Sequence, residues 1–420
     1  MRVVRTTGKS AAQAAQLLAQ LEKRGGARLD SVLPTVRHIV RDVKKRGDAA
    51  LLNYAAEFDG LKQPDMLQIS REEMAGAWEA TPVPLRKAIE VAAANIRAFA
   101  ERQLPQSWSF RPQPGLIVGQ QIRALGAVGC YVPSGRYPLP STLLMTVIPA
   151  QVSGVKRIVV VSPRPAVATL AAAHLLGIDE FYRIGGAQAV AALAYGTKYI
   201  AKVDKIVGPG NLYVTAAKKL VAFDCSIDML AGPTEALIAG NHGTAAGIAG
   251  DLVAQAEHDP EALPLFVTTN VTLARAVAAE TKRRAAKNPI AKQSIAANGI
   301  IFVARDEAEM RAITNRLAAE HLTVDTAADA EWVESAGSIF VGEWSSQPMG
   351  DYVSGPNHTL PTGQMARIRG GLSVLDYIKV ITVQQYTKTG IGKLGPAAIK
   401  LAEAEGLYGH AEAIRARGVK

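Results

Sequence analysis

Residues 157–184 read RIVVVSPRPAVATLAAAHLLGIDEFYRI. The stretch opens with a β-branched run, Arg157–Val161, continues through an alanine-rich segment of helical texture and closes with a second strand-like run, Glu180–Ile184. Parallel strands need a crossover between them, so a helix in that place predicts a strand, helix, strand unit of a parallel sheet. The same alternation includes Ala127–Val132 before the stretch and Lys205–Val207 after it. We therefore expect a Rossmann-like domain in the middle of the chain.

A second series of short strand-like runs follows, with helical segments between several of them. Its members are Ala236–Ile238, Leu265–Thr268, Gly299–Val303, Leu322–Val324 and Ser338–Val341. The first 125 residues instead carry apolar residues at helical spacing, and the tail from Ile391 to Lys420 reads as a polar helix. The predicted fold class is α/β, with two incomplete Rossmann-like parallel-sheet domains and small helical extensions at the N- and C-terminal ends.

Joints rich in Gly and Pro near Pro112–Gly115 and Ala231–Pro233 indicate that the central block is inserted into a domain that begins before it. The predicted parts are an N-terminal helical arm at 1–24, a first α/β domain at 25–127 and 237–370, a second α/β domain at 128–236, and a C-terminal arm at 371–420. The C-terminal arm has too little apolar periodicity to form its own core. We expect it to pack against its own chain or against a partner subunit.

Composition favours a globular enzyme in a reducing compartment. A chain of 420 residues exceeds what one hydrophobic core usually organises, and 48% hydrophobic with 20% charged residues is ordinary for a globular protein. The two cysteines, Cys130 and Cys225, are too few for a disulfide framework or a cysteine zinc cluster. The N-terminal residues lack the apolar core of a signal peptide, and no apolar run has the length of a membrane span. We expect a cytoplasmic protein that inserts in no membrane.

The formal net charge of +10 raises the question of nucleic-acid binding. The basic clusters Lys44–Arg46 and Lys282–Arg284 lie in helix-like segments between acidic neighbours, and no nucleic-acid-binding motif accompanies them. We interpret them as solvated helix faces that also attract anionic ligands such as a dinucleotide. No nucleic-acid partner is expected.

Histidine is the side chain that most often carries protons or binds metals near neutral pH. Three of the seven histidines, His38, His174 and His242, have plain helical or loop contexts, and we expect them to be structural or solvent-facing. Gln255 and His258 are three positions apart in a helix-like segment and project from one face. That spacing permits a metal site. Capping of a helix end by the Asp-Pro pair that follows is an alternative that spacing alone leaves open.

Glu320 and His321 lie where a helical segment meets the strand-like run Leu322–Val324. The ends of such strands are where α/β proteins place their chemistry. The ordinary pKa values of the two side chains differ by about two units, so the pair can divide two proton-transfer tasks between them. A surface turn is the alternative.

Two further segments combine carboxylates with histidine. Residues 350–362 read GDYVSGPNHTLPT, a rigid polar loop that is more typical of a ligand site than of a connector. In it, Asp351 can ligate a cation and His358 can hydrogen-bond a polar substrate. Glu405 and His410 lie five residues apart in an alanine-rich helix, where a surface pair would account for them without further context.

Together these segments are similar to the histidinol dehydrogenase family, and the similarity extends from about Leu33 to the C-terminal helix. It rests on ordered blocks: GCYVPSGRYPL at 129–139, GGAQA at 185–189, GPGN at 208–211 and AGPTE at 231–235, followed by the four histidine-bearing segments in family order. Ala319 stands where many members have Pro, and Thr234 replaces a frequent Ser. Both departures leave the required chemical groups in place.

The resemblance implies one zinc ion per subunit, with NAD as a co-substrate. The implied zinc ligands, a nitrogen and oxygen set that suits the metal, are Gln255, His258, Asp351 and His410. The implied substrate-binding residues are Thr234, Gln255, His258, His321, Asp351, His358, Glu405 and His410. The implied NAD-binding residues are Tyr131, Gln188 and Asn211, although no GxGxxG fingerprint follows the first strand of the central domain. Because the family's C-terminal His and Glu cross a dimer interface, the resemblance also implies a homodimer in which His410 and Glu405 serve the partner's active site.

The implied reaction is the oxidation of L-histidinol to L-histidine through L-histidinal with two NAD, the last steps of histidine biosynthesis. His321 would act as the general base that takes the alcohol proton, and Glu320 would activate the water that adds to the aldehyde. Cys130 has no flanking base or Lys in the sequence to lower its pKa. We therefore expect Cys130 to be structural rather than a nucleophile that forms a thiohemiacetal.

Two alternatives stay open. A paralogue on the same scaffold would oxidise another small polar alcohol, such as a sulfonated propanediol, but His358 and Glu405 suit a cationic amino group and an imidazole better than a sulfonate. A basic binding protein without activity is the alternative from a different functional class. Salt-sensitive binding of polyanions that did not depend on zinc would indicate it.

Overall fold

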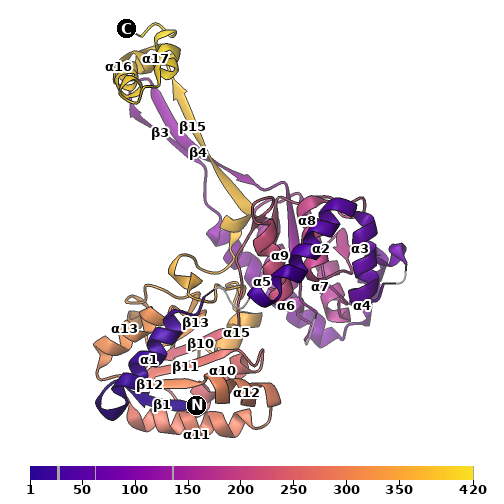
Figure 1. Ribbon diagram of the computed structural model, residues 1–420, viewed down its shortest axis with the longest axis vertical. Helices are drawn as coiled ribbons and strands as arrows, with labels where there is room; N and C mark the ends of the chain where they lie inside the picture. Colours follow the sequence, from indigo (N-terminus) through magenta and orange to yellow (C-terminus); the bar gives the residue numbers. More distant parts are fainter. Residues whose placement is uncertain (26–28, 62, 135–136, 420) are drawn as a thin grey trace.

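The computed structural model describes residues 1–25, 29–61, 63–134 and 137–419, and it contains two α/β bodies and a projecting arm (Figure 1). Gly135 and Arg136 of the block at 129–139 lie outside the described residues. Each body is built on a largely parallel sheet, so the predicted α/β class is confirmed.

The first sheet has the strand order β1-β12-β11-β10-β13-β14, and each neighbouring pair is parallel. Its described strands are β1 (Arg2–Arg5), β10 (Glu235–Ala239), β11 (Leu263–Thr268), β12 (Ile300–Val303), β13 (His321–Val324) and β14 (Ser338–Val341). The helices that cover it are α1 (Ala11–Glu22), α10 (Ala245–Ala256), α11 (Val271–Ala285), α12 (Pro289–Asn298) and α13 (Glu307–Leu317).

Both faces of this sheet are buried. Ala236 and Ile238 of β10 pack with residues of α10 and α11, whereas Leu237 and Ala239 pack with residues of α1 and α13. Successive side chains of a strand point to opposite faces, so a strand between two helical layers needs apolar residues at every position. That requirement explains why these strands read as continuous apolar runs.

The second sheet has the strand order β2-β7-β6-β5-β8-β9, in which β2 is antiparallel to β7 and the other pairs are parallel. Its described strands are β2 (Gln68–Ile69), β5 (Ala127–Tyr131), β6 (Arg157–Val161), β7 (Glu180–Tyr182), β8 (Lys205–Val207) and β9 (Ser226–Ile227). Helices on one face are α2 (Leu33–Arg46), α3 (Asp48–Tyr54), α8 (Gly186–Tyr195) and α9 (Leu212–Val221). Those on the other face are α4 (Arg71–Ala80), α5 (Val83–Gln103), α6 (Pro140–Val152) and α7 (Val167–Leu175).

This packing differs from the predicted division of the chain at two places. The prediction puts residues 25–127 in the first domain, but helices α2 to α5 pack on the second sheet, for example α2 on α8 and α5 on α6. It puts residues 1–24 in a helical arm, but Arg2–Arg5 forms an edge strand paired with β12. For the helices the physical reason is that periodicity shows an apolar face but not which sheet that face will cover. Arg2–Arg5 is too short for periodicity to distinguish a strand from the start of a helix.

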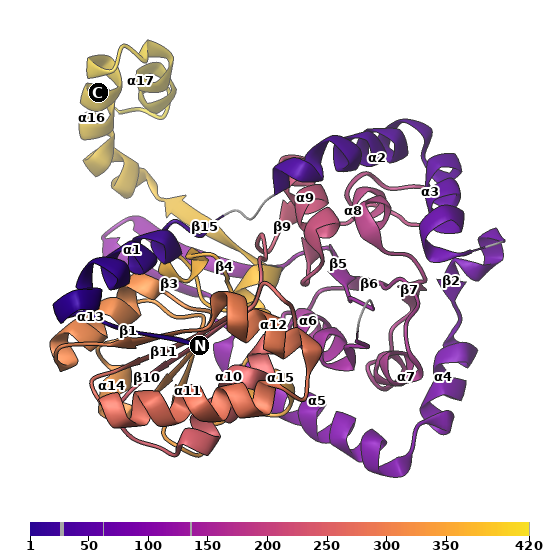
Figure 2. The same cartoon turned by 60° about the horizontal axis from the view of Figure 1, so that its bottom comes forward.

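The arm contains a three-stranded antiparallel ribbon that the sequence did not predict. It consists of β3 (Trp108–Gln113), β4 (Leu116–Ala124) and β15 (Ile378–Tyr386), and the chain then continues into α16 (Lys388–Ala404) and α17 (Tyr408–Arg415). The two helices share a small cluster of buried apolar residues at the tip of the arm, well away from both bodies (Figures 1 and 2).

Short elements complete the described chain. They are α14 (Ala327–Ala330), α15 (Gln347–Tyr352), a π-helical turn at Ala55–Asp59, and 3-10 turns at Gly8–Ser10, Leu29–Ser31, Pro64–Met66, Met365–Arg367 and Val374–Tyr377. Among the described helices, none combines the length and the apolar character that crossing a membrane requires.

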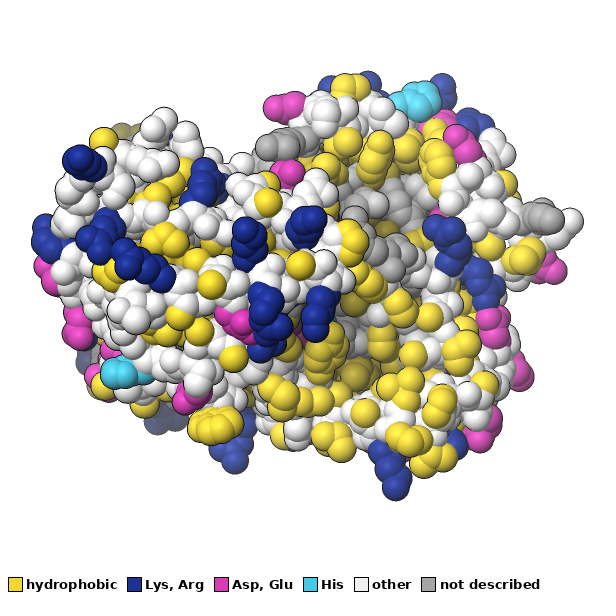
Figure 3. Space-filling model, turned by 90° about the horizontal axis from the view of Figure 1, so that it is seen from below, with side chains coloured by type: hydrophobic (Ala, Val, Ile, Leu, Met, Phe, Trp, Pro, Cys, Tyr) yellow, Lys and Arg dark blue, Asp and Glu magenta, His cyan; other side chains and the backbone are white. Residues whose placement is uncertain are grey.

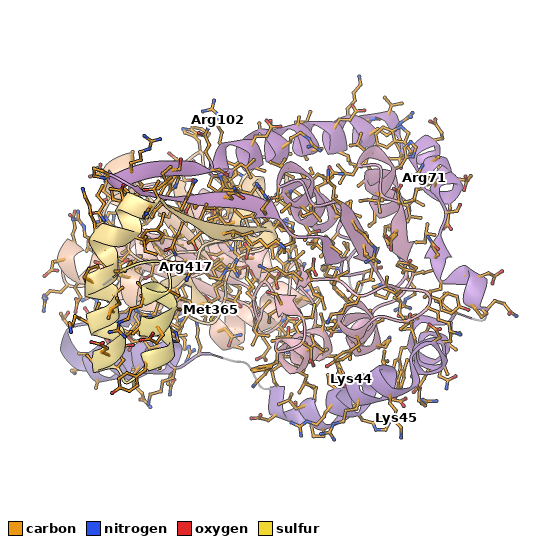
Figure 4. All side chains as sticks on the ribbon, turned by 90° about the horizontal axis from the view of Figure 1, so that it is seen from above. Lys44, Lys45, Arg71, Arg102, Met365 and Arg417 are labelled. Atoms are coloured by element: carbon orange, nitrogen blue, oxygen red, sulfur yellow. The ribbon has the colours of Figure 1, made fainter. Side chains whose placement is uncertain are left out.

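The basic clusters lie on outer helix faces, as the sequence analysis expects. Lys44 and Lys45 point outward from α2 (Figure 4), and the Lys44 ammonium lies 3.4 Å from a carboxylate oxygen of Asp224. In the other cluster, Arg283 and Arg284 both pair with Glu280. On the face seen in Figure 3, Lys and Arg side chains are spread over both bodies with Asp and Glu among them.

Candidate active site

A cavity of about 1190 Å³ lies between the two bodies. On one side it is lined by Thr234, Glu320 and His321, next to the amino ends of β10 and β13. On the other side it is lined by Thr142 near the start of α6 and Asn211 at the start of α9, which follow the carboxyl ends of β5 and β8. The cavity therefore lies between the amino ends of strands of the first sheet and the carboxyl ends of strands of the second sheet.

Glu320 and His321 reach the cavity because a helix stops just before them. Helix α13 ends at Leu317, Ala318 adopts a left-handed conformation with φ of 44°, and β13 begins at His321. His321 lies opposite Ala236 in the sheet register, so Glu320 and His321 lie beside the segment that precedes β10.

The Glu320 carboxylate is 7% exposed and is held by two hydrogen bonds. Its Oε2 accepts a hydrogen bond from the Thr234 hydroxyl at 2.6 Å and another from the Glu235 backbone N–H at 2.9 Å. Gln255 Oε1 lies 3.1 Å from the same Thr234 hydroxyl. Thr234 thus connects the predicted catalytic carboxylate to a predicted metal ligand.

The His321 imidazole lies between two carboxylates. Its Nδ1 is 3.6 Å from Glu320 Oε2, and its Nε2 is 3.4 Å from Asp351 Oδ1. The residue is 3% exposed, and within the described structure its Nδ1 has no hydrogen-bond partner. Burial is the largest influence and lowers the pKa of His321, but Glu320 and then Asp351 outweigh it and raise the pKa to about 10.

Three of the four predicted zinc ligands line this cavity. Gln255 is near the C-terminal end of α10, His258 follows in the next turn, and Asp351 lies in α15. Gln255 Nε2 is 3.3 Å from Asp351 Oδ2. Burial of Asp351 would raise its pKa, but His321, His358 and His258 together lower it. Among the described residues no cluster of three or more His, Cys, Asp or Glu forms a metal site, and one of the three predicted ligands here is a glutamine.

His358 is held from both of its ring nitrogens. Nδ1 lies 2.8 Å from the backbone oxygen of Asp351, and Nε2 lies 3.3 Å from the Thr142 hydroxyl. A carbonyl oxygen can only accept, so Nδ1 carries the proton, and Nε2 accepts from Thr142. Burial lowers the pKa of His358, which favours this neutral form. The role of Thr142 could not be predicted from the sequence, since nothing in its local pattern points to a residue that is 216 positions away.

Glu405 and His410 are not at this cavity. Glu405 follows α16 and His410 is in α17, both exposed in the arm that projects away from the two bodies (Figure 1). Neither residue therefore lines the cavity of its own chain, and the sequence predicts both of them for a partner's site.

The predicted NAD-binding residues lie at the carboxyl edge of the second sheet. Tyr131 ends β5, and its hydroxyl accepts a hydrogen bond from the Gly186 N–H at 3.1 Å. Gln188 donates from Nε2 to Asp59 Oδ2 at 3.1 Å. Asn211 is the residue of the three that lines the large cavity, where its side chain also caps α9. Tyr131 and Gln188 are buried and do not line that cavity.

Sequence analysis also missed an ion pair at the cavity wall. Glu235, part of the AGPTE block, is buried and pairs with Arg24 through two hydrogen bonds of 2.7 and 2.9 Å. Its Oε1 also accepts from the Gly363 N–H at 3.0 Å. The pair fixes the strand end that presents the Glu235 N–H to Glu320. No local signal relates Arg24 to Glu235, because they are 211 positions apart.

Cys130 behaves as the sequence analysis expects. It is fully buried in β5, and burial raises the pKa of its thiol to about 12. A thiol with that pKa stays protonated near neutral pH and makes a poor nucleophile.

Known proteins resemble this chain over nearly its whole length. A family model described as histidinol dehydrogenase matches residues 22–418. The histidinol dehydrogenase of Wolinella succinogenes is 41% identical over 99% of this chain and 100% of its own length, and that of Geobacillus kaustophilus is 45% identical over 91% and 93%. The crystal structure of histidinol dehydrogenase from Elizabethkingia anophelis superposes with a TM-score of 0.92 at 34% identity, covering 99% of this chain and 98% of that one. The chain belongs to the histidinol dehydrogenase family.

Proposed function

We propose that this protein oxidises L-histidinol to L-histidine through L-histidinal and reduces two NAD for each molecule of substrate. The observation that carries the proposal is the convergence at one cavity of Glu320 and His321 with Gln255, His258 and Asp351. Two successive oxidations at one carbon need a base for the alcohol proton, a base for water and a group that retains the aldehyde between the steps. The cavity offers candidates for all three.

Zinc is part of the proposal, and the hydrogen bonds around Thr234 support it. A hydroxyl has one proton, and Glu320 Oε2 at 2.6 Å is the closer of the two acceptors near Thr234. Gln255 Oε1 would then face the hydroxyl oxygen without a proton between them. Rotation of the Gln255 amide by half a turn lets Nε2 donate to Thr234 and turns Oε1 toward Asp351 Oδ2.

That amide orientation leaves two oxygen atoms facing each other at the position of the 3.3 Å contact. Facing oxygens repel unless a cation lies between them, and oxygen with imidazole nitrogen is a donor set that zinc accepts. We propose that Gln255, His258 and Asp351 hold zinc, which when bound would anchor the imidazole and amino nitrogens of the substrate. His410 from a second copy of the chain would complete the set.

A homodimer is proposed for the same reason. Glu405 and His410 lie exposed in the arm, which projects away from both bodies (Figure 1). Neither residue lines the cavity of its own chain, and His410 is the proposed fourth ligand. An exchange of arms between two copies would supply both cavities.

The proton transfers are assigned to the two adjacent side chains. His321 would take the alcohol proton in the first oxidation and, after releasing it to solvent, the proton of the hydrated aldehyde in the second, while NAD accepts hydride from the same carbon in each oxidation. For that role the imidazole must be neutral, and positive charge bound at Asp351 would lower the pKa that this carboxylate helps to raise. Glu320, held by Thr234 and the Glu235 N–H, would then take a proton from the water that adds to the aldehyde.

The remaining residues would orient the substrate. Thr234 and His358 line the same cavity as the proposed zinc ligands, and the partner's Glu405 would face the cationic amino group. A sulfonated alcohol would find the carboxylates of Glu320 and Asp351 on the cavity walls. Carboxylates favour a cationic substrate, which is why the amino alcohol is preferred to the sulfonate alternative.

A stoichiometric assay tests the proposal. Zinc-loaded protein should form two NADH for each L-histidinol consumed, with L-histidine as the product. His321→Asn should lose nearly all turnover and retain its zinc, because His321 is not among the proposed ligands. Preference for a sulfonated alcohol, or one NADH for each molecule consumed, would contradict the proposed reaction.

A further inference from the structure

A buried ion pair lies beneath the cofactor side of the cavity. Lys218 of α9 is 2% exposed, and its ammonium contacts the carboxylate of Asp228, which follows β9. Neither residue lines the cavity. The sequence analysis gave neither a role, and the proposed reaction uses neither.

Both charged groups bind the same glycine. The Lys218 ammonium donates to the backbone oxygen of Gly208 at 3.0 Å, and the Gly208 N–H donates to Asp228 Oδ2 at 2.8 Å. Gly208 has φ of 109°, which L side chains rarely adopt, and a Cβ there would collide with the backbone oxygen of Tyr131. The position and both polar backbone groups of Gly208 are therefore fixed.

Gly208 opens the GPGN loop, whose next three residues line the cavity. Asp228 in turn opens the crossover from the second sheet to β10, and its Oδ1 accepts the N–H of Met229. Further along that crossover, the Thr215 hydroxyl of α9 donates to the backbone oxygen of Ala231 at 3.2 Å. One ion pair thus ties together two cavity-lining segments, the GPGN loop and the crossover that leads to Thr234.

Stability alone does not explain such a pair. Removing two charges from water costs several kcal/mol per ion, and apolar side chains of similar size often fill such a space at equal or better stability. Apolar side chains cannot offer Gly208 both a donor and an acceptor. The feature that Lys218 and Asp228 add is therefore the fixed conformation of the loop.

We infer that Lys218 and Asp228 are positioning residues for the dinucleotide, acting through the GPGN loop and Asn211. The inference rests on the proposed function, in which Asn211 contacts NAD. It predicts a selective effect of losing Lys218, because the Lys218 ammonium binds Gly208 of the GPGN loop directly, whereas Asp228 would keep its hydrogen bond to the Met229 N–H at the start of the crossover. Loosening the loop should weaken binding of NAD far more than binding of histidinol.

The test compares Lys218→Met with Lys219→Met in the zinc-loaded, full-length protein. Lys219 is the adjacent residue on the same helix and is exposed, so its variant controls for loss of one positive charge. We expect Lys218→Met to raise KM for NAD about tenfold, the effect of about one lost hydrogen bond, with KM for histidinol within twofold of the parent. Lys219→Met should change neither KM by more than twofold.

A double variant, Lys218→Met with Asp228→Leu, addresses the case in which an unpaired buried carboxylate prevents folding. It leaves no unpaired charge, so it should fold with a melting temperature at or above that of Lys218→Met and still show the raised KM for NAD. Normal KM for NAD in either folded variant would overturn the inference. So would a parallel rise in both KM values with a lower melting temperature, which indicates a purely structural role.

Calorimetric titration of NAD separates this inference from the proposed function. It measures NAD binding to the zinc-loaded parent and variants and does not require turnover. If the parent binds NAD but forms no histidine, the proposed reaction fails while the comparison of Kd values still tests the ion pair. If the parent oxidises histidinol and Lys218→Met binds NAD as tightly as the parent, the inference alone is wrong.

Discussion

Thr234→Val should slow the second oxidation much more than the first. Valine has nearly the shape of threonine but no hydroxyl, so Glu320 Oε2 loses the hydrogen bond of 2.6 Å and keeps the Glu235 N–H at 2.9 Å. The hydroxyl also holds the carboxylate in place, and a misplacement of about 1 Å in a catalytic group can cost about 100-fold in the rate of the step in which that group acts. Glu320 is 7% exposed, so water replaces the missing hydroxyl poorly, and the rate of the step that uses Glu320 should fall by up to about this factor.

The assay follows NADH formation in single turnovers that start from either histidinol or supplied histidinal. Oxidation of histidinal should fall about 10- to 100-fold in Thr234→Val, and hydride transfer from histidinol should fall less than about threefold. Thr234→Ser retains the hydroxyl and should remain within about threefold of the parent in both steps. An equal loss in both steps, or an unchanged rate with histidinal, would refute the assignment of Glu320 to the water step.

Three further outcomes are expected. Tyr377→Phe should lower the free energy of unfolding in urea by about 1 kcal/mol, because the buried Tyr377 hydroxyl donates to the Thr146 backbone oxygen at 2.8 Å; an unchanged urea midpoint would contradict this. The Cys130 thiol, with its pKa raised by burial to about 12, should resist iodoacetamide at pH 8.5 in the folded protein and react in urea. The thiol of the unfolded chain has a pKa of about 8.5, so the stabilisation from burying the neutral Cys130 thiol is complete below that pH and is lost as the pH rises toward 12. The free energy of unfolding should therefore decline over that pH range, and it should decline less in Cys130→Ala. Removal of zinc by a chelator should abolish histidinol oxidation and added zinc should restore it, whereas activity that survives complete metal removal would exclude the proposed site.

The central strands of both sheets, such as β5, β6, β10, β11 and β12, could be predicted because each is buried on two faces. Arg157–Val161 is a continuous apolar run after its first residue, and such a short run between turn signals is typical of a strand in a parallel sheet. The ribbon of the arm gives no such signal. β15 has no buried residue, and its exposed positions mix Val and Ile with Gln, Lys and Thr, so neither an apolar run nor an alternation marks it.

The candidate site divides along a similar line. Glu320 with His321, and Asp351 with His358, are close in sequence, so a local pattern can indicate them. Thr142 and Arg24 act on partners more than 200 positions away, at 3.3 and 2.7 Å. Such contacts depend on how distant segments pack in the folded chain, and no periodicity or motif in either segment encodes that packing. The NAD-binding residues came from family resemblance alone, and they stay predictions.

The arrangement of the cavity follows from the polarity of helices and sheets. Ligands of open α/β sheets usually bind at the carboxyl ends of the strands, where the following helices present their N-terminal N–H groups to anions. The second sheet follows this rule, since Asn211 and Thr142 lie at the starts of α9 and α6. The first sheet does the opposite, since Gln255 and Glu320 lie at or just after the ends of α10 and α13.

A helix C-terminus carries partial negative charge and favours a cation, so the amino edge of the first sheet suits zinc and a cationic amino alcohol. The carboxyl edge of the second sheet suits the anionic diphosphate of NAD. Hydride transfer requires the two ligands to meet. Because the first sheet faces the cavity with its amino ends and the second with its carboxyl ends, the two walls of one cavity favour ligands of opposite charge. If both sheets faced the cavity with the same ends, both walls would favour the same charge.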